Sequence, residues 1–161
     1  MARPACSVND YSPFGYFWTD HRFPSLYPYL TQTPEKGENN LVSTIPHEIS
    51  LLKELVFLDL KGNNIEGTVP PTLSSLSNLL YLDLSENRLE EAIPVEVLGL
   101  SQLQYLDLGG NRLTGEVSPH IGGMEGLRYL GLGDNLLSGR LPTELGDLVV
   151  LGEVYVICFA A

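Results

Sequence analysis

The sequence predicts an α/β solenoid, in which short parallel strands alternate with short helical or 3₁₀ turns along one continuous coil. Three observations predict this fold class. Residues 55–150 divide into four segments of 24 residues in unbroken register, leucines recur at fixed positions in each segment, and 43% of the 161 residues are hydrophobic against 18% charged. The expected organisation is a half repeat at 39–54, full repeats at 55–78, 79–102, 103–126 and 127–150, and the start of a fifth at 151–156.

The first positions of each repeat predict a strand. In the second repeat, Leu79, Leu82 and Leu84 stand at positions 1, 4 and 6, so that Leu82 and Leu84 point to the same side of an extended segment. Stacking the repeats about 4.8 Å apart makes a parallel sheet whose inner face buries these leucines. One repeat alone buries too little apolar surface to be stable, so the repeats must stack.

An asparagine follows the strand in every full repeat, where the chain must turn inward. A carboxamide both donates and accepts hydrogen bonds, so it can satisfy backbone groups that the bend leaves without partners. Later apolar positions are expected to close the coil from the convex side. The asparagines are Asn63, Asn87, Asn111 and Asn135, and the closing residues are Val69, Leu73 and Leu76 in the first repeat and Leu141, Leu145 and Leu148 in the fourth.

Prolines 46, 70, 94 and 142 follow the inward turn and favour extended or single-turn helical backbone, because proline lacks an amide donor. Two departures from the repeat predict local irregularities. Glu91 replaces the glycine found as Gly67, Gly115 and Gly139, which predicts strain if that position needs a positive φ. Ser118-Pro119 shifts the proline by one residue, which predicts a bulge in that loop.

The repeat consensus, LxxLxLxxNxLxGxIPxxLxxLxx, resembles the plant-type leucine-rich repeat of receptor-like kinases, receptor-like proteins and polygalacturonase inhibitors. The four copies read LVFLDLKGNNIEGTVP from Leu55, LLYLDLSENRLEEAIP from Leu79, LQYLDLGGNRLTGEVS from Leu103 and LRYLGLGDNLLSGRLP from Leu127. The resemblance covers residues 39–156 and implies a right-handed solenoid. Its parallel sheet would curve along a concave face, with short helical turns and loops on the convex face.

Residues 1–38 are irregular and rich in aromatic residues and proline, which suggests a cap over the first coil or an unordered leader. The cap of the resembled family usually carries a cysteine pair and a Trp-rich helix, of which only Cys6 and Trp18 are present here. At the other end, residues 157–161 form an uncapped tail. We therefore expect a fragment of a longer protein, or an end-to-end dimer through the uncapped C-terminus. The start of a membrane helix at 148–161 is an alternative that Glu153 opposes.

Charge and composition exclude several classes of partner. The net charge of −11, from 9 basic and 20 acidic residues, repels phosphate backbones, so no nucleic-acid partner is expected. No apolar run reaches the length of a membrane span and no secretory signal is visible. A receptor fragment would be extracellular or membrane-associated, and otherwise the protein would be cytoplasmic.

The solvent-facing strand positions form columns that are candidate ligand contacts. Position 3 gives an aromatic column and position 5 an acidic one, flanked by further charged residues. Both could also be purely structural, since aromatic stacking between strands is itself stabilising. Carboxylates about 5 Å apart repel each other, and a cationic ligand would relieve that repulsion. The candidate ligand-binding residues are Phe57, Asp59, Tyr81, Asp83, Glu86, Tyr105, Asp107, Arg128, Tyr129, Asp134, Glu153 and Tyr155.

Several of the charged residues are expected to form ion pairs. Arg128 is expected to pair with Asp134 and Glu153 on the concave face. Arg88 and Arg112 are expected to pair with Glu66 and Glu90 on the flank.

No catalytic or metal-binding constellation is visible. His47 and His120 lie three repeats apart, roughly 15 Å by strand spacing, so they cannot share a metal. No nucleophile motif or phosphate-binding loop occurs, and exposure and repeat symmetry oppose a glycosidase pair or a calcium site in the acidic column. We expect no cofactor, no metal and no enzymatic activity.

The leading hypothesis is a non-catalytic module that binds a protein or peptide through its concave face, as part of a receptor-like signalling or defence protein. Two alternatives use the same scaffold. One is an inhibitor of a cell-wall hydrolase, and the other is an intracellular leucine-rich-repeat scaffold, which fits the unpaired Cys6 and Cys158.

Overall fold

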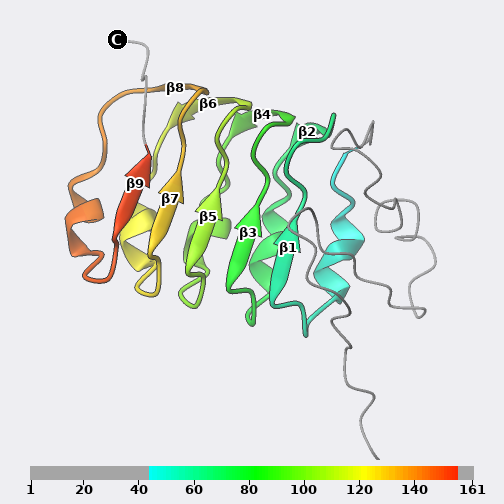
Figure 1. Cartoon of the computed structure of the whole chain (residues 1–161), viewed down its shortest axis with the longest axis horizontal. Helices are drawn as coiled ribbons and strands as arrows, with labels where there is room; N and C mark the ends of the chain where they lie inside the picture. The colour runs from blue at the N-terminus through cyan, green and yellow to red at the C-terminus, as the bar shows by residue number, and fades with distance from the viewer. Residues whose placement is uncertain (1–43, 156–161) are drawn as a thin grey trace, which may run out of the picture.

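Five short parallel strands form a sheet along one face of the solenoid (Figure 1). The structure, a computed structural model, describes residues 44–155. The strands are β1 (Phe57–Asp59), β3 (Tyr81–Asp83), β5 (Tyr105–Asp107), β7 (Tyr129–Gly131) and β9 (Glu153–Tyr155), in the order β1-β3-β5-β7-β9. Equal positions of neighbouring repeats lie opposite each other, as Leu82 does with Leu58 and Leu106. The predicted solenoid, its strands and its register are confirmed.

A second parallel sheet, which the sequence analysis did not predict, runs along the upper flank of Figure 1. Its strands are β2 (Glu66–Thr68), β4 (Arg88–Ala92), β6 (Arg112–Glu116) and β8 (Leu136–Ser138), in the order β2-β4-β6-β8. Only one residue of β4, Leu89, is buried, and its other side chains are exposed. The flank therefore lacks the apolar alternation that normally identifies a strand in a sequence.

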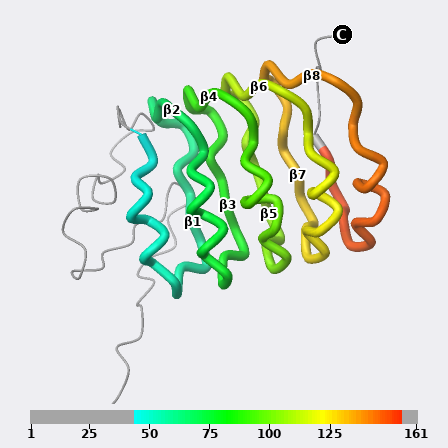
Figure 2. Tube along the Cα trace, turned by 180° about the vertical axis from the view of Figure 1, so that it is seen from behind, coloured from blue at the N-terminus to red at the C-terminus, as the bar shows by residue number. Residues whose placement is uncertain are grey.

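Single 3₁₀ turns cover the opposite side of the coil, which Figure 2 shows from behind. They are η2 (His47–Leu51), η3 (Pro71–Ser75), η4 (Val97–Gly99), η5 (Pro119–Gly123) and η6 (Thr143–Asp147). Pro46, Pro70 and Pro142 each stand immediately before a turn with extended backbone, as the sequence predicts.

The two departures from the repeat have different outcomes. Glu91 adopts φ 65°, in the left-handed region, where Gly67 and Gly115 have φ 78°, so the predicted strain is confirmed. The bulge predicted at Ser118-Pro119 is wrong. Ser118 takes the extended backbone (ψ 143°) that prolines adopt in other coils, and its hydroxyl accepts a hydrogen bond from the His120 amide, so the turn stays in register.

The leucine columns form one continuous core. Leu82, Leu106 and Leu73 are completely buried, as predicted. Leu141 is 43% exposed, so its predicted burial is wrong, although Leu148 of the same repeat is buried. The residues equivalent to Leu141 in earlier repeats, Val69, Ile93 and Val117, are buried, because another coil follows each of them, whereas within residues 44–155 no further full coil packs against the outer side of the last repeat.

Asparagines join successive coils beside the strands, as predicted. The Asn87 Nδ2 group donates to the carbonyls of Leu60, Leu84 and Ser85, and its Oδ1 accepts from the Ile65 amide at 3.1 Å. One side chain thus satisfies backbone groups of two coils in a buried position where water cannot replace it.

The outer end of the last described coil exposes apolar side chains. Val149 is 91% exposed, and Val150 and Val154 are about half exposed. The end-to-end dimer stays a prediction. Residues 1–38, the first part of the half repeat and the tail 157–161 lie outside the described residues. From residue 44 to 155, no helix has the length and apolar character needed to cross a membrane.

Candidate functional site

Four aromatic rings form a continuous stack across β1, β3, β5 and β7 on the concave face. The ring centroids of Phe57 and Tyr81 lie 4.1 Å apart, and those of Tyr81 with Tyr105 and of Tyr105 with Tyr129 lie 4.2 Å apart. The interplanar angles are 8°, 11° and 6°. The stack, which we call the aromatic ladder, follows from the register, because each ring belongs to a residue paired with its neighbour across the sheet.

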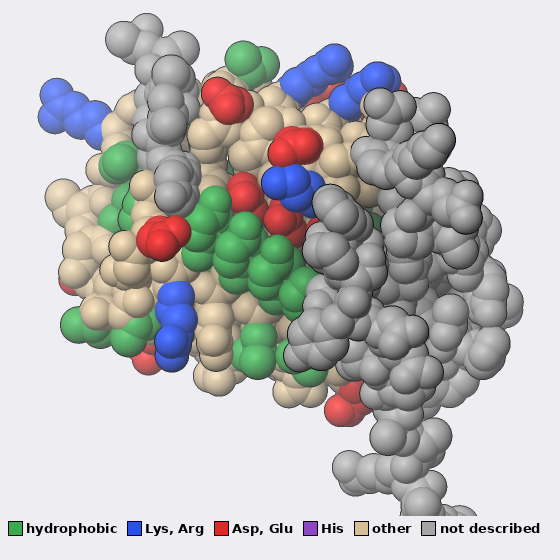
Figure 3. All heavy atoms as spheres, in the orientation of Figure 1, with side chains coloured by type: hydrophobic (Ala, Val, Ile, Leu, Met, Phe, Trp, Pro, Cys, Tyr) green, Lys and Arg blue, Asp and Glu red, His purple; other side chains and the backbone are tan. Residues whose placement is uncertain are grey.

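The exposed parts of the ladder are mainly the edges of its rings. The inner rings, Tyr81 and Tyr105, have their faces covered by neighbouring rings, and all four residues are only half-buried. In Figure 3 hydrophobic side chains form a diagonal band with acidic side chains along its upper edge. The ladder is therefore an apolar strip with a charged border.

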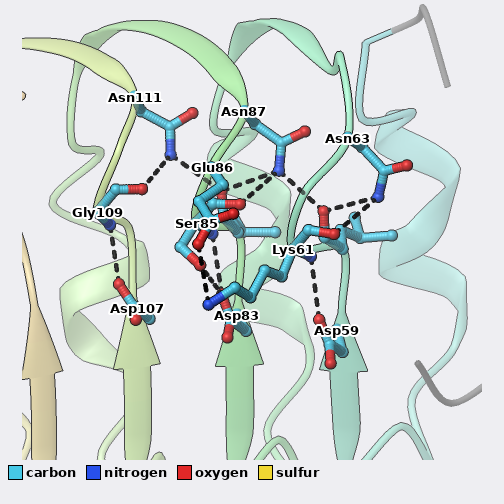
Figure 4. Close-up of polar contacts among 12 residues, drawn as sticks. Asp59, Lys61, Asn63, Asp83, Ser85, Glu86, Asn87, Asp107, Gly109 and Asn111 are labelled. Carbon is cyan, nitrogen blue, oxygen red and sulfur yellow. Dashed lines mark hydrogen bonds and ion pairs between the residues drawn. The ribbon is translucent and has the colours of Figure 1, made fainter. Parts of the chain in front are cut away.

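Each strand of the ladder from β1 to β5 ends in an aspartate that holds the following loop. The amide of Lys61 donates to Asp59 Oδ1 at 3.0 Å, and the amide of Gly109 donates to Asp107 Oδ1 at 2.9 Å (Figure 4). Asp83 Oδ1 accepts both the amide and the hydroxyl of Ser85, at 2.9 and 2.6 Å. These are local turns in which an aspartate satisfies backbone donors where the ladder of strand hydrogen bonds stops.

Two of these aspartates, Asp83 and Asp107, also accept hydrogen bonds from the ladder. The Tyr81 hydroxyl donates to Asp83 Oδ2 at 3.3 Å, and the hydroxyls of Tyr105 and Tyr129 donate to Asp107 Oδ2 at 3.4 and 3.2 Å. Burial, followed by the nearby carboxylates, raises the pKa of the Tyr81 hydroxyl above its ordinary value. The hydroxyls are thus donors at neutral pH, and hydrogen bonds join the three tyrosines of the ladder to Asp83 and Asp107.

Asp59, Asp83 and Asp107, which we call the acidic row, are less exposed than the sequence predicts. Asp83 and Asp107 are only 3% and 9% exposed, so both residues are largely buried at the concave face, whereas Asp59 is half-buried. Burial is also the main reason that the pKa of Asp83 is raised, although its hydrogen bonds to Ser85 lower it. A contact between these carboxylates and a ligand stays a prediction.

The acidic row ends at β7, where Gly131 takes the place of an aspartate. A Cβ at position 131 would collide with the Asp107 carboxylate. Only a glycine leaves room for Asp107 to lean toward β7 and accept from Tyr129.

Lys61 is part of the site that the sequence analysis missed. Its Nζ lies 3.1 Å from Glu86 Oε1 on the next coil, and this contact is the main cause of a raised Lys61 pKa. Glu86 has φ 55°, a left-handed backbone that costs free energy for a residue with a side chain. The signal in the sequence was a lysine two residues after Asp59, where the next repeats carry Ser85 and Gly109.

The ion pairs predicted for Arg128 are wrong. Arg128, Asp134 and Glu153 are all exposed, and the described residues contain no ion pair between Arg128 and either acid. Arg128 precedes β7 and Asp134 follows it, whereas Glu153 lies opposite Tyr129 in the register.

On the flank, Arg88 and Glu66 form the predicted ion pair at 3.5 Å. Arg112 faces Glu90 in the register, but within residues 44–155 the two form no ion pair, so that prediction is wrong. The side chain of Tyr155 lies outside the described part. Among the described side chains, no group of three or more His, Cys, Asp or Glu residues could hold a metal ion.

Two family models, both described as leucine-rich repeat, match the chain. One covers residues 66–113 and the other covers residues 54–76 and 126–148. A comparison with curated proteins found no match.

Solved structures of plant proteins are similar to the chain. The ectodomain of the receptor kinase GASSHO1/SCHENGEN3 from Arabidopsis thaliana, solved with CASPARIAN STRIP INTEGRITY FACTOR 2, is 36% identical with a TM-score of 0.68, over 71% of this chain and 14% of that one. The Arabidopsis receptor kinase HAESA, solved with the peptide hormone IDA and the co-receptor SERK1, is 33% identical with a TM-score of 0.66, over 73% and 21%. A plant ice-binding protein is 28% identical with a TM-score of 0.70, over 74% and 39%. The chain therefore spans only a minor part of each of these proteins.

Proposed function

Because the chain belongs to the leucine-rich repeat family, we propose that it is a non-catalytic recognition module that binds a peptide, or an extended segment of a protein, across the aromatic ladder. As in the sequence analysis, we place this module in a receptor-like signalling or defence protein. The observation that carries the proposal is the unbroken stack of Phe57, Tyr81, Tyr105 and Tyr129 on the concave face.

The dimensions of the ladder suit an extended peptide. Its rings lie on four strands about 4.8 Å apart, so the strip is roughly 14 Å long and accommodates about four or five extended residues. Apolar side chains of the peptide would pack against the ring edges, and polar groups would face the charged border. Stacked tyrosines lose little conformational entropy on binding, which favours them as interface anchors.

The similar structures support a peptide ligand. HAESA was solved with a peptide hormone, and GASSHO1/SCHENGEN3 with a named factor. Since this chain covers only 14% of GASSHO1/SCHENGEN3 and 21% of HAESA, a role in signalling is part of the proposal, and the partner is described only by its chemistry.

A selection experiment tests the proposal. Random ten-residue peptides displayed on phage are selected on the wild-type chain and then tested on Tyr105→Ala, which interrupts the ladder. The matched control, Arg112→Ala, removes an exposed side chain from the second sheet. We expect selected peptides to lose at least tenfold in affinity on Tyr105→Ala, to bind Arg112→Ala unchanged, and to retain binding on Tyr105→Phe, which keeps the ring.

Circular dichroism and urea unfolding establish that each variant is folded. Recovery of no binding peptide, or peptides that bind Tyr105→Ala as tightly as the wild type, would contradict the proposed site.

A further inference from the structure

The acidic row lies in register at the border of the aromatic ladder. Asp59 is paired with Asp83, and Asp83 with Asp107, so successive carboxylates follow the strand spacing of about 4.8 Å. Their hydrogen bonds to amides and hydroxyls stabilise the charges but add no positive charge. Without a cation nearby, the row would attract any positively charged side chain laid across the ladder.

The protein supplies that cation itself. Lys61 begins beside Asp59, whose Oδ1 accepts its amide, and its side chain crosses to Glu86 on the next coil (Figure 4). Its ammonium group contacts Glu86, and the charges of Asp83 and Asp107 add to the effect of Glu86 in raising its pKa.

Two further described cations, Lys53 and Arg88, contact groups outside the acidic row. Lys53 Nζ donates to the carbonyl of Ser75 at 3.3 Å, and Arg88 pairs with Glu66 on the second sheet. In Figure 3 one Lys or Arg side chain is enclosed by acidic side chains along the upper edge of the hydrophobic band.

We propose that Lys61 sets the charge specificity of the concave face: its ammonium group offsets part of the negative charge of Glu86 and the acidic row, so that the ladder accepts peptides with neutral side chains and binds a lysine or arginine over the row less tightly than it would without Lys61. This inference rests on the peptide-binding function proposed above. It also bears on the expected cationic ligand, because the chain itself supplies a cation that offsets part of the carboxylate repulsion.

The Lys61–Glu86 pair is accessible to a ligand. The two side chains are 49% and 62% exposed, so a bound peptide can contact the ammonium group directly. Its charge therefore acts at the binding surface.

Two synthetic peptides measure the specificity. Both are acetylated and amidated and share the frame Ser-Gly-X-Gly-X-Gly-X-Ser, with X either leucine or lysine. Dissociation constants come from NMR titration of the wild-type chain, Lys61→Gln and Lys53→Gln. Lys53→Gln is a matched control, because it removes the same charge away from the ladder.

The expected result is a change in the ratio of the two dissociation constants. Removing a unit charge about 5 Å from a bound cation changes its affinity by about fourfold at the dielectric constant of water, and by more than about a hundredfold at an effective value of about 20. We therefore expect Lys61→Gln to shift the ratio at least fivefold toward the lysine peptide, and Lys53→Gln to shift it less than twofold. The shift decreases in 0.5 M salt.

The remaining outcomes separate the two proposals. An unchanged ratio in Lys61→Gln, or equal shifts in both variants, overturns the role of Lys61 and leaves peptide binding intact. If Lys61→Gln weakens both peptides equally, Lys61 is a general contact and not a charge filter. If neither peptide binds any variant, the peptide-binding function fails and the inference fails with it.

Discussion

Replacing Glu91 by glycine is expected to stabilise the protein. Glu91 adopts φ 65°, where the three equivalent positions are Gly67, Gly115 and Gly139. A left-handed backbone costs a residue with a Cβ about 1 to 2 kcal/mol. Glycine removes that strain but gains about 0.4 to 1 kcal/mol of conformational entropy in the unfolded chain. The Glu91 side chain is exposed, so its loss removes no core packing, and the net gain is about 1 kcal/mol.

The measurement is equilibrium urea unfolding, supported by thermal unfolding, where about 1 kcal/mol corresponds to a rise of about 2 to 4 °C for a chain of this size. Glu90→Gly is the matched control, because Glu90 is the adjacent exposed strand residue and has no positive φ. It should destabilise the chain by about 0.5 to 1 kcal/mol, since glycine weakens a strand. The reasoning is refuted if Glu91→Gly is no more stable than the wild type, or if both variants change stability in the same direction.

Three further predictions follow from the core, the asparagines and the ladder. Asn87→Ala should lower the free energy of unfolding by about 2 to 4 kcal/mol in urea, because it leaves buried backbone groups of two coils without partners; a loss below 1 kcal/mol would contradict this. Leu106→Ala should cost about 2 to 5 kcal/mol and Leu141→Ala much less, since the first is fully buried and the second is 43% exposed; equal losses would contradict the core assignment. Burial raises the hydroxyl pKa of Tyr81 and Tyr105, so both should stay protonated in the folded chain when ordinary tyrosines ionise. The unfolded state then releases protons that the folded state keeps, and stability should fall as pH rises above about 10, which absorbance at 295 nm and urea unfolding at pH 8 and 11 would measure.

The acidic row shows where a pattern predicts position but not environment. The spacing places Asp83 and Asp107 on the solvent side of their strands, and the register confirms that they lie in one row. Their burial arises from neighbouring coils: Tyr129 donates to Asp107 from the next repeat, and the absence of a Cβ at Gly131 leaves room for the carboxylate. The position of an aspartate within its own repeat does not indicate which side chains of the neighbouring repeat cover it.

The sequence by itself determined the repeat, the strands and the aromatic ladder, because each depends on residues at fixed spacing within one coil or on identical positions stacked in register. It also identified Glu91 as the exception to a glycine position, and the structure shows the left-handed backbone there. The tertiary structure decided the second sheet, the exposure of Leu141 and the ion pair between Lys61 and Glu86. These depend on contacts between coils and on the direction of long, flexible side chains. A lysine can reach any of several carboxylates within its length, and only the folded geometry selects one.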